Sequence, residues 1–316
     1  MMLDALVQSC EMMVVLAAAP LLAGYVRKVK ALLVGRRGPP LLQPYRDLLR
    51  LLRKEVVLAH SASWFFRAAP YLVFAATWVA AALVPTFATG LLFSYSADMI
   101  AIVALLGTAR FVLALAGLDV GTSFGGIGSS REMMIASLAE PAMLMVVFTL
   151  SLLAGSTQLS SIAAFMQGPD VGLRVSLALA LVALVMVALA ENARIPVDNP
   201  ATHLELTMVH EAMILEYSGR HLAMIEVASF VKLLLYVSII VCVFAPWGIA
   251  SAGAGAAAYL FGLAAYAAKL ALAGFLLAVF ESAIAKMRVF RVSDFLGAAL
   301  MLGVLAILLR FVSGSA

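Results

Sequence analysis

The sequence predicts an all-α integral membrane protein, with about eight transmembrane helices and amphipathic helices in its cytoplasmic loops. Hydrophobic residues make up 65% of the 316 residues and charged residues only 12%, which is about half the charged share of a soluble domain. The apolar residues also gather in long runs, each close to the roughly 20 residues that a helix needs to cross a bilayer. We therefore treat residues 1–316 as a single polytopic membrane domain.

Apolar runs of this length occur at eight places along the chain. They lie at Leu3–Val26, Pro70–Leu92, Ala97–Leu118, Met133–Ala154, Val171–Ala190, Leu222–Ala245, Ala256–Phe280 and Phe295–Val312. The first run has Asp4 and Glu11 at its start and basic residues only behind it, so we expect a retained span and not a cleaved signal peptide. Glu11, near the outer end of this span, is expected to be solvated.

Basic residues lie mostly on one side of the predicted bundle. The connection after the first span carries ten of them between Arg27 and Arg67, and the connections after spans three, five and seven carry more. The opposite side has only Arg174 and Arg310. The positive-inside rule then places these four connections in the cytoplasm, with both termini on the outer face of the cell inner (plasma) membrane.

The first of these connections contains a predicted amphipathic helix. Gly38, Pro39 and Pro40 predict a turn, and Pro44 suits the first turn of a helix with arginines on one face and leucines on the other. Two interpretations stay open, since such a helix binds anionic lipid or forms a docking surface for a soluble partner. The candidate docking residues are Arg36, Arg37, Arg46, Arg50, Arg53 and Arg194.

A glycine-rich connection, Gly117–Glu132, precedes the fourth span. Its glycines predict a segment that is flexible or closely approached by another part of the chain. Ser129 and Glu132 have the spacing of a capping box, which predicts that the helix of span four begins there.

The segment Glu191–Gly219 holds an unusual share of the charged residues of the chain. Pro196 and Pro200 interrupt any helix that continues from the fifth span. From Thr202 the segment predicts a short amphipathic helix that ends at a Gly219 cap. On this helix one face would carry His203, Thr207, His210 and Glu211, and the opposite face Glu205 and Glu216.

Several ionisable residues lie inside the predicted spans, where a charge is costly and therefore marks a candidate functional residue. They are interpreted either as a proton relay or as static ion pairs that fix helix packing. The candidate relay combines them with the acidic segment and comprises Arg110, Glu140, Glu191, Asp198, Glu205, Glu211, Glu216, Glu226, Lys232, Lys269 and Glu281.

Other chemistries lack their motifs. Cys10 and Cys242 lie far apart in apolar runs and form no CxxC, which excludes an iron–sulfur or structural zinc site held by cysteine. His210 and Glu211 do not form HExxH, and no GxSxG elbow of a hydrolase occurs. We therefore expect no metal site, no catalytic residue and no nucleic-acid partner, and we expect His60 to be a surface histidine.

Four segments of the sequence resemble one family. They read RRGP…LQPYRDLLRLL, GLDVG…SRE, EPAMLM and ENARIPVD…EYSG. The family is subunit 1 of respiratory complex I, with its counterparts in membrane-bound [NiFe] hydrogenases and formate hydrogenlyases. The resemblance implies a membrane subunit that binds no cofactor itself. Its partners would be soluble hydrogenase-like and iron–sulfur subunits, which carry the iron–sulfur clusters and a [NiFe] centre, and antiporter-like membrane subunits. By motif match the acidic loop of the family falls on Glu191, Arg194, Asp198, Glu205 and Glu216, and its span-four acid on Glu140.

One stretch departs from the complex I pattern. After Pro200 the complex I version usually carries a compact acidic run, whereas this chain reads ATHLELTMVHEAMIL. Formate hydrogenlyase members often keep the compact run too, so the departure favours a hydrogenase-like branch other than the best-known ones. From the resemblance as a whole we expect an ion-translocating oxidoreductase of the energy-converting hydrogenase or formate hydrogenlyase type. In it this chain would anchor the soluble redox arm and couple redox chemistry to proton or sodium movement. The alternatives are a quinone-chamber subunit of NADH:quinone oxidoreductase, a passive anchor and a stand-alone secondary transporter, although no inverted repeat supports the last.

Overall fold

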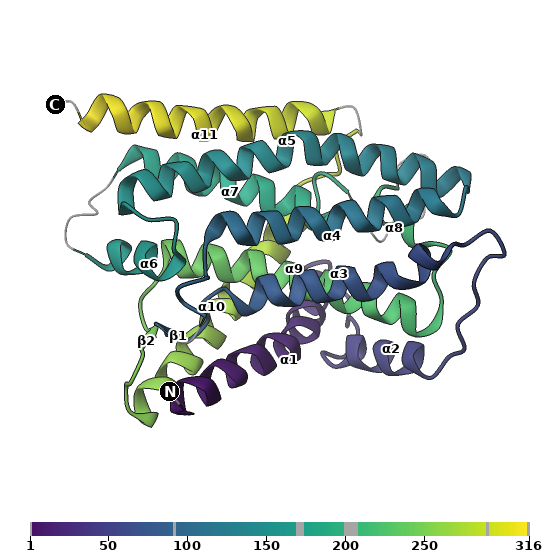
Figure 1. Ribbon diagram of the computed structural model, residues 1–316, viewed down its shortest axis with the longest axis horizontal. Coiled ribbons are helices and arrows are strands. Elements are labelled where there is room, and N and C mark those ends of the chain that lie inside the picture. The colour runs from purple at the N-terminus through teal and green to yellow at the C-terminus, as the bar shows by residue number, and fades with distance from the viewer. Residues whose placement is uncertain (1, 91–92, 169–173, 199–207, 289–290, 315–316) are drawn as a thin grey trace.

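Long helices run side by side through the computed structural model, which describes residues 2–90, 93–168, 174–198, 208–288 and 291–314 (Figure 1). The regular secondary structure of the described residues is almost entirely helical, as predicted. The helices are α1 Met2–Leu33, α2 Gln43–Leu52, α3 Trp64–Ala82, α4 Met99–Asp119, α5 Ser123–Ala154, α6 Leu159–Gln167, α7 Val175–Glu191, α8 His210–Ile214, α9 Gly219–Phe244, α10 Ala256–Ala283 and α11 Val292–Gly314.

The described helices account for about eight membrane passages. Seven of them, α1, α3, α4, α5, α9, α10 and α11, are long and apolar enough to span a bilayer. α7 is shorter, with 17 residues, but it is apolar and lies among the long helices (Figure 1). Together they correspond in order to the eight predicted spans.

Two predicted helix starts are wrong. The sequence predicts the second span at Pro70–Leu92, but α3 begins at Trp64, where the Ser63 side chain accepts a hydrogen bond from the Phe65 amide. α3 ends at Ala82, close before Pro85, because a residue that precedes proline avoids helical geometry.

The fourth span begins ten residues earlier than expected. Thr122 caps α5 by accepting a hydrogen bond from the Gly125 amide. The predicted capping box is therefore wrong, because Ser129 and Glu132 both lie inside α5, where the Ser129 hydroxyl donates to the Ala114 carbonyl at 2.8 Å.

The amphipathic helix α2 confirms its prediction. Pro44 lies in its first turn, and Leu48 is buried against the bundle, but Leu49 and Leu52 of the predicted leucine face are each 54% exposed. The predicted docking arginines of this region are exposed, namely Arg36, Arg37, Arg46, Arg50 and Arg53, and so is His60.

The two ends of the bundle differ. α2 and α8 lie at one end, while the other end holds α6, both termini and the strands β1 Ala88–Thr89 and β2 Ala250–Ser251 (Figure 1). The two strands pair in parallel.

Glu11 contradicts the prediction that it is solvated, because it is only 4% exposed. Its Oε1 accepts hydrogen bonds from the Thr86 amide and hydroxyl and from the amides of Phe87 and Ala88. The carboxylate thus fixes the chain before β1 onto α1.

The best-buried span is α9, which packs against α1, α2, α3, α6, α7 and α10. Beside it, α5 packs against α4, α7 and α11. The space among α4, α5, α7 and α9 is consequently in the interior of the bundle, while α10 and α11 are its least buried spans.

Candidate functional site

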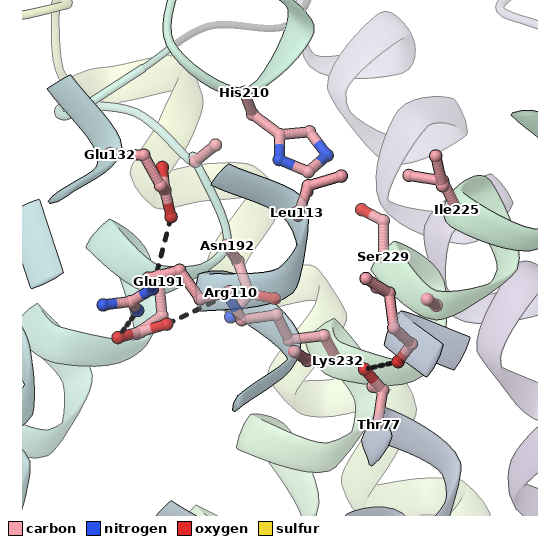
Figure 2. Close-up of a pocket in the computed structure, with 14 residues that line it drawn as sticks. Thr77, Arg110, Leu113, Glu132, Glu191, Asn192, His210, Ile225, Ser229 and Lys232 are labelled. Atoms are coloured by element: carbon pink, nitrogen blue, oxygen red, sulfur yellow. Dashed lines mark hydrogen bonds and ion pairs between the residues drawn. The ribbon is translucent and has the colours of Figure 1, made fainter. Parts of the chain in front are cut away.

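Five charged side chains meet in this interior, and we call them the Arg110 cluster. Arg110 comes from α4, Glu132 and Glu140 from α5, Glu191 from the end of α7, and Lys232 from α9. Figure 2 shows Arg110 together with Glu132, Glu191 and Lys232.

Arg110 is the centre of this cluster. Its Nε lies 3.3 Å from Glu132 Oε1 and its Nη1 lies 3.6 Å from Glu140 Oε1, while its Nη2 pairs with Glu191 Oε1. Lys232 Nζ lies 2.9 Å from Glu191 Oε2. Glu191 therefore bridges the two cations.

The charges in the cluster do not balance. Three carboxylates face two cations, so a single negative charge is left over when every group is ionised. The Arg110 side chain is 2% exposed and the Glu191 side chain 3%. The Glu140 side chain is 43% exposed, so solvent screens part of this excess charge.

Small residues allow the acids to come close. A Cβ atom on Gly107 would lie 3.3 Å from Glu140 Oε1, so glycine at this position leaves room for the carboxylate. Around Gly128, the Cβ position lies 2.9 Å from both the Val209 carbonyl oxygen and the Ala212 side chain, which brings α8 against α5. The glycine-rich stretch is thus closely approached, one of its two predicted properties.

A second set of ion pairs lies toward the α2 end of the bundle. Glu281 of α10 pairs with Lys30 of α1 at 2.7 Å and with Arg194 at 3.5 Å, and Asp198 pairs with Lys286 at 2.8 Å. We call these residues the Glu281 group. Both acids are almost fully buried.

Arg194 differs from its predicted role on the surface. Its side chain is 18% exposed and lies against Glu281, so its position does not support a part in docking. Burial lowers the pKa of the Arg194 guanidinium, and the Glu281 carboxylate opposes this shift. An arginine in such a place remains a cation held by its acid partner.

Two cavities adjoin these groups. The small cavity has a volume of about 50 Å³ and is lined by Arg110, Glu132, Glu191 and Lys232. The large cavity has a volume of about 320 Å³ and is lined by members of the Glu281 group together with Glu211 and Glu226. Most of the predicted acids therefore face a cavity.

Other members of the predicted relay lie elsewhere. Lys269 of α10 donates to the carbonyl oxygens of Ala245, at 2.7 Å, and Trp247, which follow the far end of α9. Glu216 lies in the turn after α8 and lines neither cavity. Glu205 lies outside the described residues.

The predicted helix from Thr202 to Gly219 is wrong in its described part. α8 ends at Ile214, and Gly219 starts α9 with φ of 54°. A Cβ atom on Gly219 would lie 2.7 Å from the Glu55 carbonyl oxygen, so glycine serves a close approach and not a helix end. His203 and Thr207 lie outside the described residues.

Glu132 was missed because its spacing from Ser129 favoured a helix start. The available signal was the composition of the preceding stretch, GLDVGTSFGGIGSS, whose small residues permit close helix packing and hence burial of the acid that follows.

Among the described residues, no group of three or more His, Cys, Asp or Glu side chains is arranged to hold a metal ion.

The fold and the site together define a multi-pass membrane protein with a buried network of ionisable side chains. The sequence profile of the NADH dehydrogenase family matches residues 7–312. The chain therefore belongs to this family, as the resemblance of its motifs implied.

Two proteins of Escherichia coli K12 are similar to this chain in sequence. Formate hydrogenlyase subunit 4 is 33% identical over 278 residues, which cover 88% of this chain and 89% of that protein. Hydrogenase-4 component C is 33% identical over 239 residues, with coverage of 75% and 74%. NADH-quinone oxidoreductase subunit 8 of Rhodothermus marinus is 28% identical over 243 residues, with coverage of 72% and 69%.

A solved structure has the same fold. One chain of the membrane-bound sulfane sulfur reductase, an archaeal respiratory membrane complex, superposes with a TM-score of 0.77 at 18% identity and covers 96% of this chain and 99% of its own length. The helical fold is thus shared with that chain.

Proposed function

We propose that this chain is the membrane subunit of an ion-translocating oxidoreductase complex of the energy-converting [NiFe] hydrogenase or formate hydrogenlyase type. The observation that carries the proposal is spatial. Ionisable groups lie at the α2 end, in the Glu281 group, and further inside the bundle, in the Arg110 cluster. The similarity to formate hydrogenlyase subunit 4 and hydrogenase-4 component C favours this branch.

The chain would supply the path of the ion, while the partners supply the electrons. Iron–sulfur clusters and a [NiFe] centre would belong to soluble subunits, which dock at the end of the bundle where α2 exposes its arginines. That end would face the cytoplasm, because basic loops stay on the inner side. Antiporter-like membrane subunits would receive the ion from this chain.

Coupling would act through the segment that links α7 to α9. Its α8 packs onto α5 at Gly128, and the Arg131 guanidinium donates to the Met208 carbonyl at 2.8 Å. A shift of this segment after electron transfer would change the surroundings of Glu132 on the same helix. Carboxylates in such sites respond by taking up or releasing a proton.

Glu191 is the group whose protonation would have the largest effect. When its carboxylate takes up a proton, Arg110 and Lys232 both lose a negative partner. The cluster then loses its excess negative charge and attracts a further proton less strongly. Charge, rather than a large movement, would pass the signal along the bundle.

The quinone-chamber alternative has weaker support. The NADH-quinone oxidoreductase relative from Rhodothermus marinus is 28% identical, against 33% for the two hydrogenase-type proteins. Labelling with a photoreactive quinone analogue separates the two, because a hydrogenase-type subunit should not be labelled specifically. A stand-alone transporter would move solute without partners.

The test is purification of the complex through a tag on this chain. We expect iron–sulfur proteins and nickel to copurify. In proteoliposomes, hydrogen evolution from reduced methyl viologen should be accompanied by ion movement, and Glu140→Gln should abolish the ion movement while evolution continues. The exposed Glu55→Gln is the matched control. Unchanged coupling in Glu140→Gln would exclude the proposed role.

A further inference from the structure

His210 lies at the boundary between the two cavities. Five residues line both of them, namely Asn192, Ala193, His210, Ile225 and Ser229. Histidine is the only one of these residue types that ordinarily gains and loses a proton near neutral pH. Within the described part of the chain, the imidazole of His210 is therefore the one side chain titrating near neutral pH that lines both the small and the large cavity.

The imidazole points into the small cavity, between Glu132 and Ser229 (Figure 2). The charged groups that line this cavity are Arg110 from α4, Glu132 from α5, Glu191 from α7 and Lys232 from α9. His210 thus stands beside the cluster whose charges are not balanced.

The large cavity on its other side is also charged. Its acids are Asp198, Glu211, Glu226 and Glu281, and its cations are Arg27, Lys30 and Arg194. These groups come from α1, α8, α9, α10 and the connection after α7. A proton donor and a proton acceptor are consequently available on the two sides of His210.

The backbone holds His210 in this place. It is the first residue of α8, and the preceding Val209 carbonyl lies close to Gly128 of α5. Arg131 fixes the neighbouring Met208 carbonyl. The close packing at Gly128 sets the distance from the backbone of residue 210 to the cavity, so the ring reaches it without displacing α5.

We infer that His210 transfers protons between the Glu281 group and the Arg110 cluster, an inference that rests on the proposed function. A neutral imidazole accepts a proton at its unprotonated nitrogen and becomes an imidazolium. It then releases the proton from its other nitrogen to a carboxylate in the cavity on the opposite side of the ring. The ring is then the other tautomer, and turning it by half a rotation presents its unprotonated nitrogen to the proton donor again, so no other reactant is consumed.

The test uses the assembled complex in proteoliposomes with His210→Ala. We expect hydrogen evolution from reduced methyl viologen to continue, while proton movement per turnover falls about tenfold or more. Added imidazole should restore proton movement, because a free imidazole occupies the space of the deleted ring. A residue with a merely structural role would not respond to imidazole. His60→Ala, at an exposed histidine, is the matched control.

The outcomes separate this inference from the function on which it rests. Wild-type proton movement in His210→Ala overturns the inference, and so does a loss that imidazole does not restore. If His210→Ala fails to assemble, His210→Gln takes its place and must show the same loss of proton movement. If wild-type complex moves no ion, or Glu140→Gln stays coupled, the proposed function fails instead.

Discussion

Arg110 shows how one buried side chain ties three helices together. Its guanidinium meets carboxylates from α5 and α7 while it is itself anchored in α4. Arginine suits this place because it stays charged and presents several donors in a fixed plane. A residue with one donor or no charge leaves carboxylates unpaired in the interior.

Replacing Arg110 with methionine should therefore destabilise the protein. Loss of one partner from a buried ion pair costs about 3 kcal/mol or more, because the remaining charge stays buried without compensation. We expect Arg110→Met to lower the midpoint of thermal unfolding of the purified complex, whereas Arg46→Gln on the exposed face of α2 should leave it unchanged. Equal midpoints for both variants would contradict the assigned role.

At the other end of the bundle, Glu11 is a buried charged residue that joins separate parts of the chain, as Arg110 does. In Glu11→Ala the amides of Phe87 and Ala88 and the Thr86 hydroxyl lose their shared acceptor. Hydrogen bonds to a charged group contribute about 2 kcal/mol each, so we expect a clear fall in thermal stability. Glu11→Gln keeps an acceptor oxygen and should fall between Ala and wild type. Measurement of the unfolding midpoint checks this order.

The sequence singled out most of the cluster but not its arrangement. Arg110, Glu140 and Lys232 were recognisable because a charge inside an apolar run is expensive. Their meeting around Glu191 depends on how α4, α5, α7 and α9 pack, which one sequence does not specify. Glu11 was misjudged for the same reason, since its four donors lie more than 70 residues away.

At the scale of elements, glycines decide which helices approach each other. Gly219 begins α9 with φ of 54° and faces the backbone of Glu55 and Lys54. The connection before α3 is thereby held against the start of α9. Nothing in the local sequence distinguishes this use of glycine from a helix cap, so its role was predicted wrongly.

The variant Gly219→Ala should separate these two segments. Left-handed backbone geometry costs a non-glycine residue about 1–2 kcal/mol, and the added Cβ would lie 2.7 Å from the Glu55 carbonyl oxygen. We expect lower yield and a lower unfolding midpoint. Gly126→Ala, in α5 with open space around its Cβ position, should be neutral or slightly stabilising. The idea fails if the two variants behave alike.

Helix existence was easier to predict than helix ends. All eight apolar runs correspond to helices, because burial in lipid requires a helix of that length. The ends depend on single caps, such as Thr122 for α5 and Ser63 for α3. Several serines and threonines near each end satisfy the same pattern, and packing selects among them.

At the scale of the molecule, both termini lie at the end opposite α2 (Figure 1). The distribution of basic residues predicts that this end faces outward. Cysteine labelling tests the orientation, after replacement of the exposed Cys10 by serine and with the buried Cys242 left in place. An impermeant maleimide should label Tyr95→Cys in intact cells, but Arg37→Cys only after the membrane is opened. The reverse pattern would invert the topology.

The most direct test of the whole account is the number of protons moved per electron in a Glu191→Gln complex. Glu191 bridges Arg110 and Lys232, so its carboxylate is the point through which the cluster must change charge. We predict that the assembled variant evolves hydrogen while its proton-to-electron ratio falls to the level of passive leak. A ratio equal to that of the wild-type complex would show that the buried charges only hold the helices together.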